Sequence, residues 1–278
     1  MKCKVVELKK DYPFLSENGC NPTLTVYVPE LVQDYFKSEG RKGILICPGG
    51  GYEFCSDREA EPIALKFLNM GYNAYVLNYS CAPHRFPTQL NEVAAAFDYI
   101  IKNSEEFIQN KEKIGIIGFS AGGHLAAHYS NAYNIPEVRK NFSNSYKPTV
   151  SVLCYAVITS DSDYSHHGSF KSLIGSYPNG ASDEKYSCDK LVTSDTPPAF
   201  IWHTAEDACV PVENSLFYAL ALSKNKIPYE LHIYPDGCHG LSTTDEMTMH
   251  KKELADSGKV SHVHEWLRSY ELWEKIFF

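Results

Sequence analysis

Short apolar runs alternate with amphipathic stretches of helical spacing along most of the chain. The runs typical of strands are residues 4–8, 23–28, 43–47, 73–79, 113–119, 149–158, 199–204 and 229–235. The run at 43–47 stops at Pro-Gly-Gly-Gly, which is typical of a buried strand that ends in a turn. The first two strands have no helix between them, so they are expected to pair as an antiparallel edge.

The stretches between the later strands predict helices. Ser56 and Glu59 have the spacing of a capping box, Pro62 is tolerated in a first turn, and Gly71 predicts a helix end. Further helices are expected from Pro87, over 122–133 and 212–224, and in the tail from 260. Strands that alternate with helices predict an α/β fold with a doubly wound, mostly parallel sheet.

Residues 159–197 interrupt this alternation. They are rich in Ser, Asp, Gly, Tyr and His, and so long a loop in a compact domain is usually functional. We interpret residues 1–278 as one domain in which 159–197 is a small insertion over the mouth of the site.

Composition narrows the class of protein. The chain has 278 residues, of which 44% are hydrophobic and 22% charged, as in ordinary globular proteins. With a net charge of -8 and no basic stripe, it is not expected to bind nucleic acid. No apolar run approaches the roughly 20 residues that cross a bilayer, and the N-terminal apolar stretch is too short for a signal peptide. Nine cysteines without a Cys-x-x-Cys motif indicate free thiols in a reducing, cytoplasmic setting.

The strongest chemical signal is Gly-Phe-Ser-Ala-Gly at 118–122. A predicted strand enters this motif and a predicted helix leaves it. Such a turn holds the serine in strained backbone angles, lifts its hydroxyl above the sheet and needs small neighbours. Ser120 is therefore the predicted nucleophile.

A tetrahedral intermediate needs backbone donors for its oxyanion. The N–H of Ala121, directly after the nucleophile, is one predicted donor. The glycines at 49–51 follow an earlier central strand, and we expect the others to be Gly50 and Gly51, although sequence alone does not choose among the three. A phosphate-binding loop is disfavoured because no Gly-Lys-Ser/Thr follows.

The base should lie downstream, because this arrangement runs Ser, then acid, then His. His239 stands in a glycine-flanked loop after the last predicted strand, whereas His232 falls within that strand. His239 is the predicted base.

The acid should follow the preceding strand, at 205–211. Asp207, which begins Asp-x-x-Val-Pro, is preferred to the adjacent Glu206. Asp161 and Asp163, after an earlier strand, are the alternatives.

We expect neither a metal nor an organic cofactor. His124 and His128 are four residues apart, but no Glu lies between them as in the zinc motif His-Glu-x-x-His. They are interpreted as a packed histidine pair. Cys55, Cys209 and Cys238 fall near the predicted site loops. None of them lies in a strand–turn–helix motif like that of Ser120, so none is predicted to be the nucleophile.

In order, these segments resemble an α/β-hydrolase of the small microbial esterase group, close to acetyl-xylan esterases and lipase-like carbohydrate esterases. The resemblance covers roughly residues 40–245 and is carried by Ile-Cys-Pro-Gly-Gly-Gly-Tyr at 46–52, Glu-Ala-Glu-Pro at 59–62, Gly-Phe-Ser-Ala-Gly-Gly-His-Leu-Ala at 118–126, Pro-Pro-Ala-Phe at 197–200, and the segments around Asp207 and His239. Pro48 and Phe119 stand where the hormone-sensitive-lipase relatives have His and Asp. The departures favour the sugar-ester group, and membership implies short acyl groups on a sugar or similar alcohol.

The expected partner is a small-molecule ester, with no membrane or nucleic acid; a homo-oligomer stays open. A serine peptidase or arylformamidase would use a similar triad. A non-catalytic receptor is a third possibility, but such members usually lose the serine or histidine.

Overall fold

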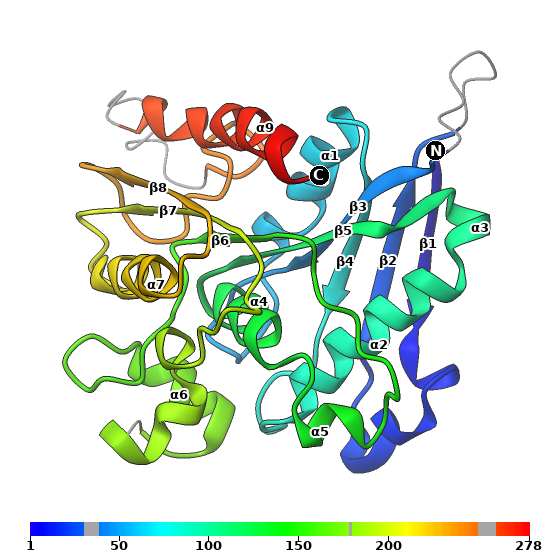
Figure 1. Ribbon diagram of the computed structural model, residues 1–278, viewed down its shortest axis with the longest axis horizontal. Coiled ribbons are helices and arrows are strands. Elements are labelled where there is room, and N and C mark those ends of the chain that lie inside the picture. Colours follow the sequence, from blue (N-terminus) through cyan, green and yellow to red (C-terminus); the bar gives the residue numbers. More distant parts are fainter. Residues whose placement is uncertain (31–38, 178–179, 250–259) are drawn as a thin grey trace.

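The computed structural model describes residues 1–30, 39–177, 180–249 and 260–278. Within these residues eight strands form one sheet in the order β1-β2-β4-β3-β5-β6-β7-β8 (Figure 1). The strands are β1 Lys2–Glu7, β2 Thr23–Val28, β3 Arg41–Cys47, β4 Asn73–Asn78, β5 Gln109–Phe119, β6 Ser151–Cys154, β7 Ala199–Thr204 and β8 Tyr229–Tyr234.

The sheet is parallel from β4 to β8, and β2 pairs antiparallel with both β1 and β4. The predicted antiparallel edge is confirmed. The carboxyl ends of β3, β5, β7 and β8 therefore open onto the same edge of the sheet, which brings the loops that follow them together.

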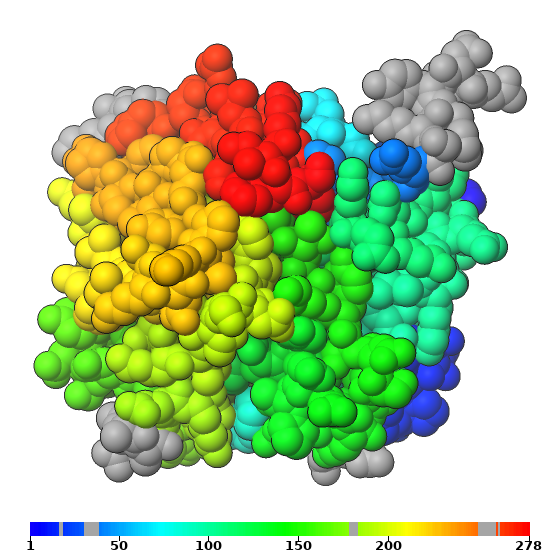
Figure 2. Space-filling view, in the orientation of Figure 1, coloured from blue at the N-terminus to red at the C-terminus, as the bar shows by residue number. Residues whose placement is uncertain are grey.

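Helices cover both faces of the sheet (Figure 1). Helices α1 (Glu61–Asn69) and α9 (Trp266–Phe277) lie on one face, and α2 (Thr88–Lys102), α4 (Ser120–Ala132) and α7 (Glu213–Lys224) lie on the other. Figure 2 shows α9, in red, packed between the region of β8 and α1 at the surface. The short helices are α3 (Ser104–Phe107), α5 (Pro136–Arg139) and α6 (His167–Ile174).

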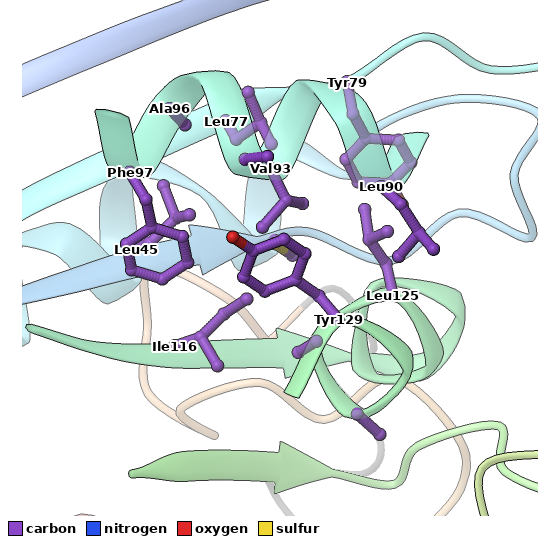
Figure 3. Packing of buried hydrophobic residues seen from close by; sticks show 14 of the residues in the cluster. Leu45, Leu77, Tyr79, Leu90, Val93, Ala96, Phe97, Ile116, Leu125 and Tyr129 are labelled. Atoms are coloured by element: carbon purple, nitrogen blue, oxygen red, sulfur yellow. The ribbon is translucent and has the colours of Figure 1, made fainter. Parts of the chain in front are cut away.

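Alternating residues of the central strands feed two cores. Leu45 and Ile116 pack against α2 and α4, together with Phe97 and Tyr129 (Figure 3). Their neighbours along the strand point the other way, as Ile44 does toward α1 and α9. A buried strand with apolar residues at every position is what a sheet covered on both faces requires.

Several predicted boundaries were wrong. Strand β6 ends at Cys154 and not at residue 158, because Tyr155 adopts a left-handed φ of 38°. Helix α4 begins at Ser120, two residues earlier than predicted.

The capping box was also wrong. Residues 57–59 form a 3₁₀ turn, α1 begins at Glu61, and the Ser56 side chain caps no N–H group. Glu59 is buried and its carboxylate accepts hydrogen bonds elsewhere.

The 159–197 segment is not the long loop that was predicted, since it carries α6 and two 3₁₀ helices, Gly180–Tyr186 and Cys188–Lys190. Residues 178–179 within it lie outside the described residues. The assignment of one domain with an insertion stays a prediction.

Candidate active site

Ser120 stands at the turn between β5 and α4 with a φ of 53°. The turn closes only with glycines around it: a Cβ on Gly118 would lie 2.1 Å from the Gly122 carbonyl oxygen, and one on Gly122 would lie 2.2 Å from that of Pro48. The Ser120 hydroxyl thus sits at the N-terminus of a 13-residue helix, where negative charge is favoured.

His239 reaches this hydroxyl from the loop after β8. Its Nε2 lies 2.8 Å from Ser120 Oγ, and its Nδ1 lies 2.6 Å from Asp207 Oδ2. Since a carboxylate only accepts, Nδ1–H donates to Asp207 and Nε2 is left to accept from the serine. The neighbouring Gly237 and Gly240 have φ values of 137° and 80°, which shape the loop.

Both carboxylate oxygens of Asp207 have hydrogen-bonding partners. Its Oδ1 accepts the N–H groups of Cys209 and Val210, each at 2.9 Å, and its Oδ2 lies 3.3 Å from His203 Nε2. Burial raises the pKa of the Asp207 carboxyl, but the hydrogen bonds from His203 and His239 outweigh burial and hold that pKa well below its usual range. The carboxylate is therefore ionised at neutral pH.

The other three candidate acids do not contact His239. Glu206 is exposed on the same loop. Asp161 and Asp163 are exposed on the loop before α6, where Asp161 accepts the N–H of Asp163. Of the four carboxylates considered from sequence, the structure joins only Asp207 to His239.

The glycine loop after β3 lies beside the serine. Gly49 donates its N–H to Glu59 Oε2 at 2.8 Å, so this N–H is already used. Gly50 and Gly51, with φ values of 124° and 65°, line the same cavity as Ser120 and His239. Ala121 is in the first turn of α4, where N–H groups have no intrahelical acceptor.

Residues 26–222 match the protein family described as BD-FAE. The chain belongs to this family. It is an α/β-hydrolase of the carbohydrate esterase group, which confirms both the predicted fold class and the predicted resemblance.

Among sequence relatives, an acetylxylan esterase of Xylanibacter ruminicola is 34% identical over 92% of this chain and 49% of its own length. The endo-1,4-beta-xylanase B of Butyrivibrio fibrisolvens is 36% identical over 86% of this chain and 37% of its own length. The chain thus spans half or less of these relatives. The solved structure of an acetyl ester-xyloside bifunctional hydrolase from Caldicellulosiruptor lactoaceticus matches with a TM-score of 0.81 and 33% identity, over 98% of this chain and 96% of that one.

In this BD-FAE member a cavity of about 290 Å³ opens above Ser120 and His239. Phe54, Arg58 and His166 line its walls. Phe54 is 60% exposed, so an aromatic side chain at the wall of the cavity faces solvent.

The 159–197 segment reaches the cavity through His166 and Gly168. His166 Nδ1 accepts the Ser169 N–H at the start of α6, and its Nε2 lies 3.6 Å from Cys209 Sγ. Burial, and then the nearby His239, lower the pKa of His166.

Sequence reasoning missed four residues of the site: Glu59, Tyr155, His166 and His203. Glu59 was taken for a helix cap, and His166 belongs to the segment that was predicted to lie over the mouth of the site. His203 lies in β7, four residues before Asp207, with its Nδ1 2.8 Å from Ser215 Oγ and its Nε2 3.0 Å from the Val210 carbonyl oxygen. That spacing between histidine and acid was the available signal.

His124 and His128 are buried as a packed pair. His124 Nδ1 bonds the Tyr52 hydroxyl at 2.8 Å, its Nε2 bonds the Tyr186 carbonyl at 2.7 Å, and His128 stacks on Phe86. In the described part of the chain no cluster of three or more His, Cys, Asp or Glu side chains could hold a metal ion. Over the same residues no helix has the length and apolarity to span a bilayer.

Proposed function

We propose that this chain is a serine carboxylic ester hydrolase that removes short acyl groups, acetyl in particular, from sugars or oligosaccharides. The observation that carries the proposal is the continuous hydrogen-bonded chain from Ser120 Oγ through His239 to Asp207, at 2.8 and 2.6 Å. The names of the relatives, an acetylxylan esterase and an acetyl ester-xyloside hydrolase, support the substrate class.

In the proposed reaction His239 Nε2 takes the Ser120 proton as Oγ bonds to the acyl carbon. The carbonyl π electrons move to oxygen, where the N–H groups of Gly50, Gly51 and Ala121 stabilise the negative charge. When the carbonyl re-forms, the C–O bond to the alcohol breaks and the alkoxide takes the proton from His239. Water, deprotonated by the same imidazole, then attacks the acyl carbon; the bond to Ser120 Oγ breaks, Oγ takes the proton back from His239, and the acid is released.

Asp207 has two roles in this scheme. It keeps the Nδ1–H tautomer of His239, so that Nε2 faces the serine, and its charge stabilises the imidazolium that forms. Its hydrogen bonds to the loop N–H groups hold it in place during both steps.

A sugar alcohol suits the walls of the cavity. An exposed aromatic ring offers a flat apolar surface on which the C–H face of a pyranose can stack, and Phe54 is such a ring. Glu53 and Arg58 supply polar groups for hydroxyls at the same cavity.

The relatives support a short acyl group, because two of them are named for acetyl esters. Acetate esters should therefore be cleaved faster than octanoate esters.

The test is Ser120→Ala, assayed at one pH on acetylated xylo-oligosaccharides, p-nitrophenyl acetate and octanoate, and peptide amides. The variant should lose hydrolysis by about 10³–10⁶-fold and keep its melting temperature. Ser130→Ala is the matched control, because Ser130 lies on the same helix and its hydroxyl donates to the Ala126 carbonyl within that helix. Activity retained in Ser120→Ala would refute the triad, and faster cleavage of amides than of esters would favour a peptidase or amidase.

A further inference from the structure

Glu59 is a buried carboxylate that the proposed reaction does not use. It is 3% exposed, and both of its oxygens accept hydrogen bonds from neutral donors. Burial of a carboxylate is costly unless its hydrogen bonds are satisfied, so these two contacts show what the residue is placed to do.

The first contact holds the glycine loop. Glu59 Oε2 accepts the Gly49 N–H at 2.8 Å, and the Gly49 carbonyl accepts the Ser56 N–H at 3.0 Å. A Cβ on Gly49 would lie 2.6 Å from Glu59 Oε2 and 3.0 Å from Ser120 Cβ, so the loop is pressed between the carboxylate and the nucleophile turn. Both peptide groups of Gly49 are fixed directly before Gly50 and Gly51.

The second contact reaches the histidine. Glu59 Oε1 accepts the Tyr155 hydroxyl at 2.6 Å, and the Tyr155 ring stands edge-on to the His239 ring with centroids 5.0 Å apart. The same hydroxyl accepts the Ser242 N–H at 3.0 Å. Tyr155 has a φ of 38°, a strained conformation that turns the chain after β6 toward this contact.

The residue before Glu59 ties the same two loops. Arg58 Nη1 donates to the Gly240 carbonyl at 2.7 Å, and the Ser242 hydroxyl donates to the Arg58 carbonyl at 2.8 Å. Residues 58–59 therefore connect the loop that carries the predicted oxyanion donors with the loop that carries His239.

We propose that Glu59 is a positioning residue for ester hydrolysis, holding the glycine loop so that the Gly50 and Gly51 N–H groups point at the oxyanion, and holding His239 in place through Tyr155. The inference rests on the proposed function. Glu59 acts through Gly49 and Tyr155 and takes no proton in the reaction.

Such a role has a kinetic signature. The oxyanion exists only in the transition state and intermediate, so misaligned donors lower kcat and leave KM nearly unchanged. Loss of one oxyanion donor typically costs about 10²–10³-fold in kcat. Glu59→Ala removes both contacts and should cost about 10²-fold. Glu59→Gln keeps one acceptor oxygen for Gly49 and should cost about 10-fold.

The experiment measures kcat and KM on p-nitrophenyl acetate for Glu59→Ala, Glu59→Gln and Tyr155→Phe, with thermal unfolding. A trifluoromethyl ketone, which forms a hemiketal oxyanion on the serine, reports transition-state complementarity directly. The inhibition constant for this ketone should rise by the same factor as kcat falls. Tyr155→Phe, which leaves the Gly49 contact intact, should lose less than Glu59→Ala.

Glu61→Ala is the matched control, because Glu61 is an exposed carboxylate two residues further along the chain; it should change neither constant. A folded Glu59→Ala enzyme with unchanged kcat, or with a raised KM alone, would overturn the positioning role. If Glu59→Ala does not fold, Glu59→Gln decides, and unchanged kcat and ketone affinity there would also overturn it. A wild-type chain that cleaves no ester refutes the proposed function itself, whereas activity lost in Ser120→Ala but kept in the Glu59 variants refutes only this inference.

Discussion

The Sγ atom of Cys209 lies 3.6 Å from Nε2 of His166, and both side chains line the cavity above Ser120. Cys209 is exposed, and it lies on the loop that carries Asp207. A bulky adduct on this thiol would occupy the space that the alcohol of the substrate needs.

We therefore expect N-ethylmaleimide to inhibit the enzyme, although its predicted nucleophile is a serine. Partial desolvation of the Cys209 thiol by its neighbours, and then the charge of Asp207, raise its pKa although the residue is exposed, so inactivation should accelerate as the pH rises. Residual activity against time, at pH 7 and pH 9, measures this.

The control for that experiment is Cys3→Ser, because Cys3 is also an exposed thiol but lies on β1 at the edge of the sheet. Cys209→Ser should remove the sensitivity and Cys3→Ser should keep it. Equal inactivation of Cys209→Ser and wild type would place the sensitive thiol elsewhere.

Asp207→Asn should lower kcat by about 10³–10⁴-fold. The Asn oxygen can keep the bonds from the Cys209 and Val210 N–H groups, so the loop should stay folded. The side-chain NH₂ group of the Asp207→Asn variant would donate to His239 Nδ1. This favours the tautomer of His239 with the proton on Nε2, which then cannot accept the proton of Ser120. Kinetics on p-nitrophenyl acetate with melting temperatures test this, and Asp161→Asn, the carboxylate not joined to His239, should behave as wild type.

Glu92 should make the protein less stable as the pH rises. This buried carboxyl accepts the Ser80 N–H at 2.7 Å, and burial raises its pKa from 4.5 to about 7. Between these values the unfolded chain releases the proton first, so the free energy of unfolding falls from pH 4.5 to 7 and levels off above. The full effect is about 3 kcal/mol.

Glu92→Gln should flatten this dependence. In urea titrations, the free energy of unfolding of Glu92→Gln minus that of wild type should be larger at pH 8 than at pH 5. Glu105→Gln, which changes an exposed carboxylate on α3, is the matched control. A difference between Glu92→Gln and wild type that does not vary with pH would contradict the assignment.

The buried pair His124 and His128 should make the protein less stable as the pH falls, which is opposite to the effect of Glu92. Burial lowers the pKa of His124 to about 4 and that of His128 to about 3, from 6.5. Below pH 6.5 the unfolded chain binds these protons and the folded chain does not, so stability falls as the pH falls. At pH 5 each histidine should cost about 2 kcal/mol. His128→Phe, which preserves stacking on Phe86, should therefore lose less stability than wild type between pH 7 and pH 5; equal losses would refute this.

The sequence by itself determined the features that depend on neighbours along the chain. Short apolar runs marked the strands, and the glycines around Ser120 marked a turn that only small residues can form. These are local constraints, so β2 and β7 begin and end at the predicted residues. The position of His239 after the last strand followed from the same reading.

Only the tertiary structure decided which distant groups meet. Ser120 and His239 are 119 positions apart, and they meet because β5 and β8 end at the same edge of one sheet. Asp207 and not Glu206 meets the histidine, because the N–H groups of Cys209 and Val210 bind the Asp207 carboxylate within the protein. Glu59 has the local spacing of a helix cap, but its carboxylate instead accepts hydrogen bonds from Gly49 and Tyr155, which are 10 and 96 positions away. If Glu59 capped the helix, these two buried donors would lack an acceptor.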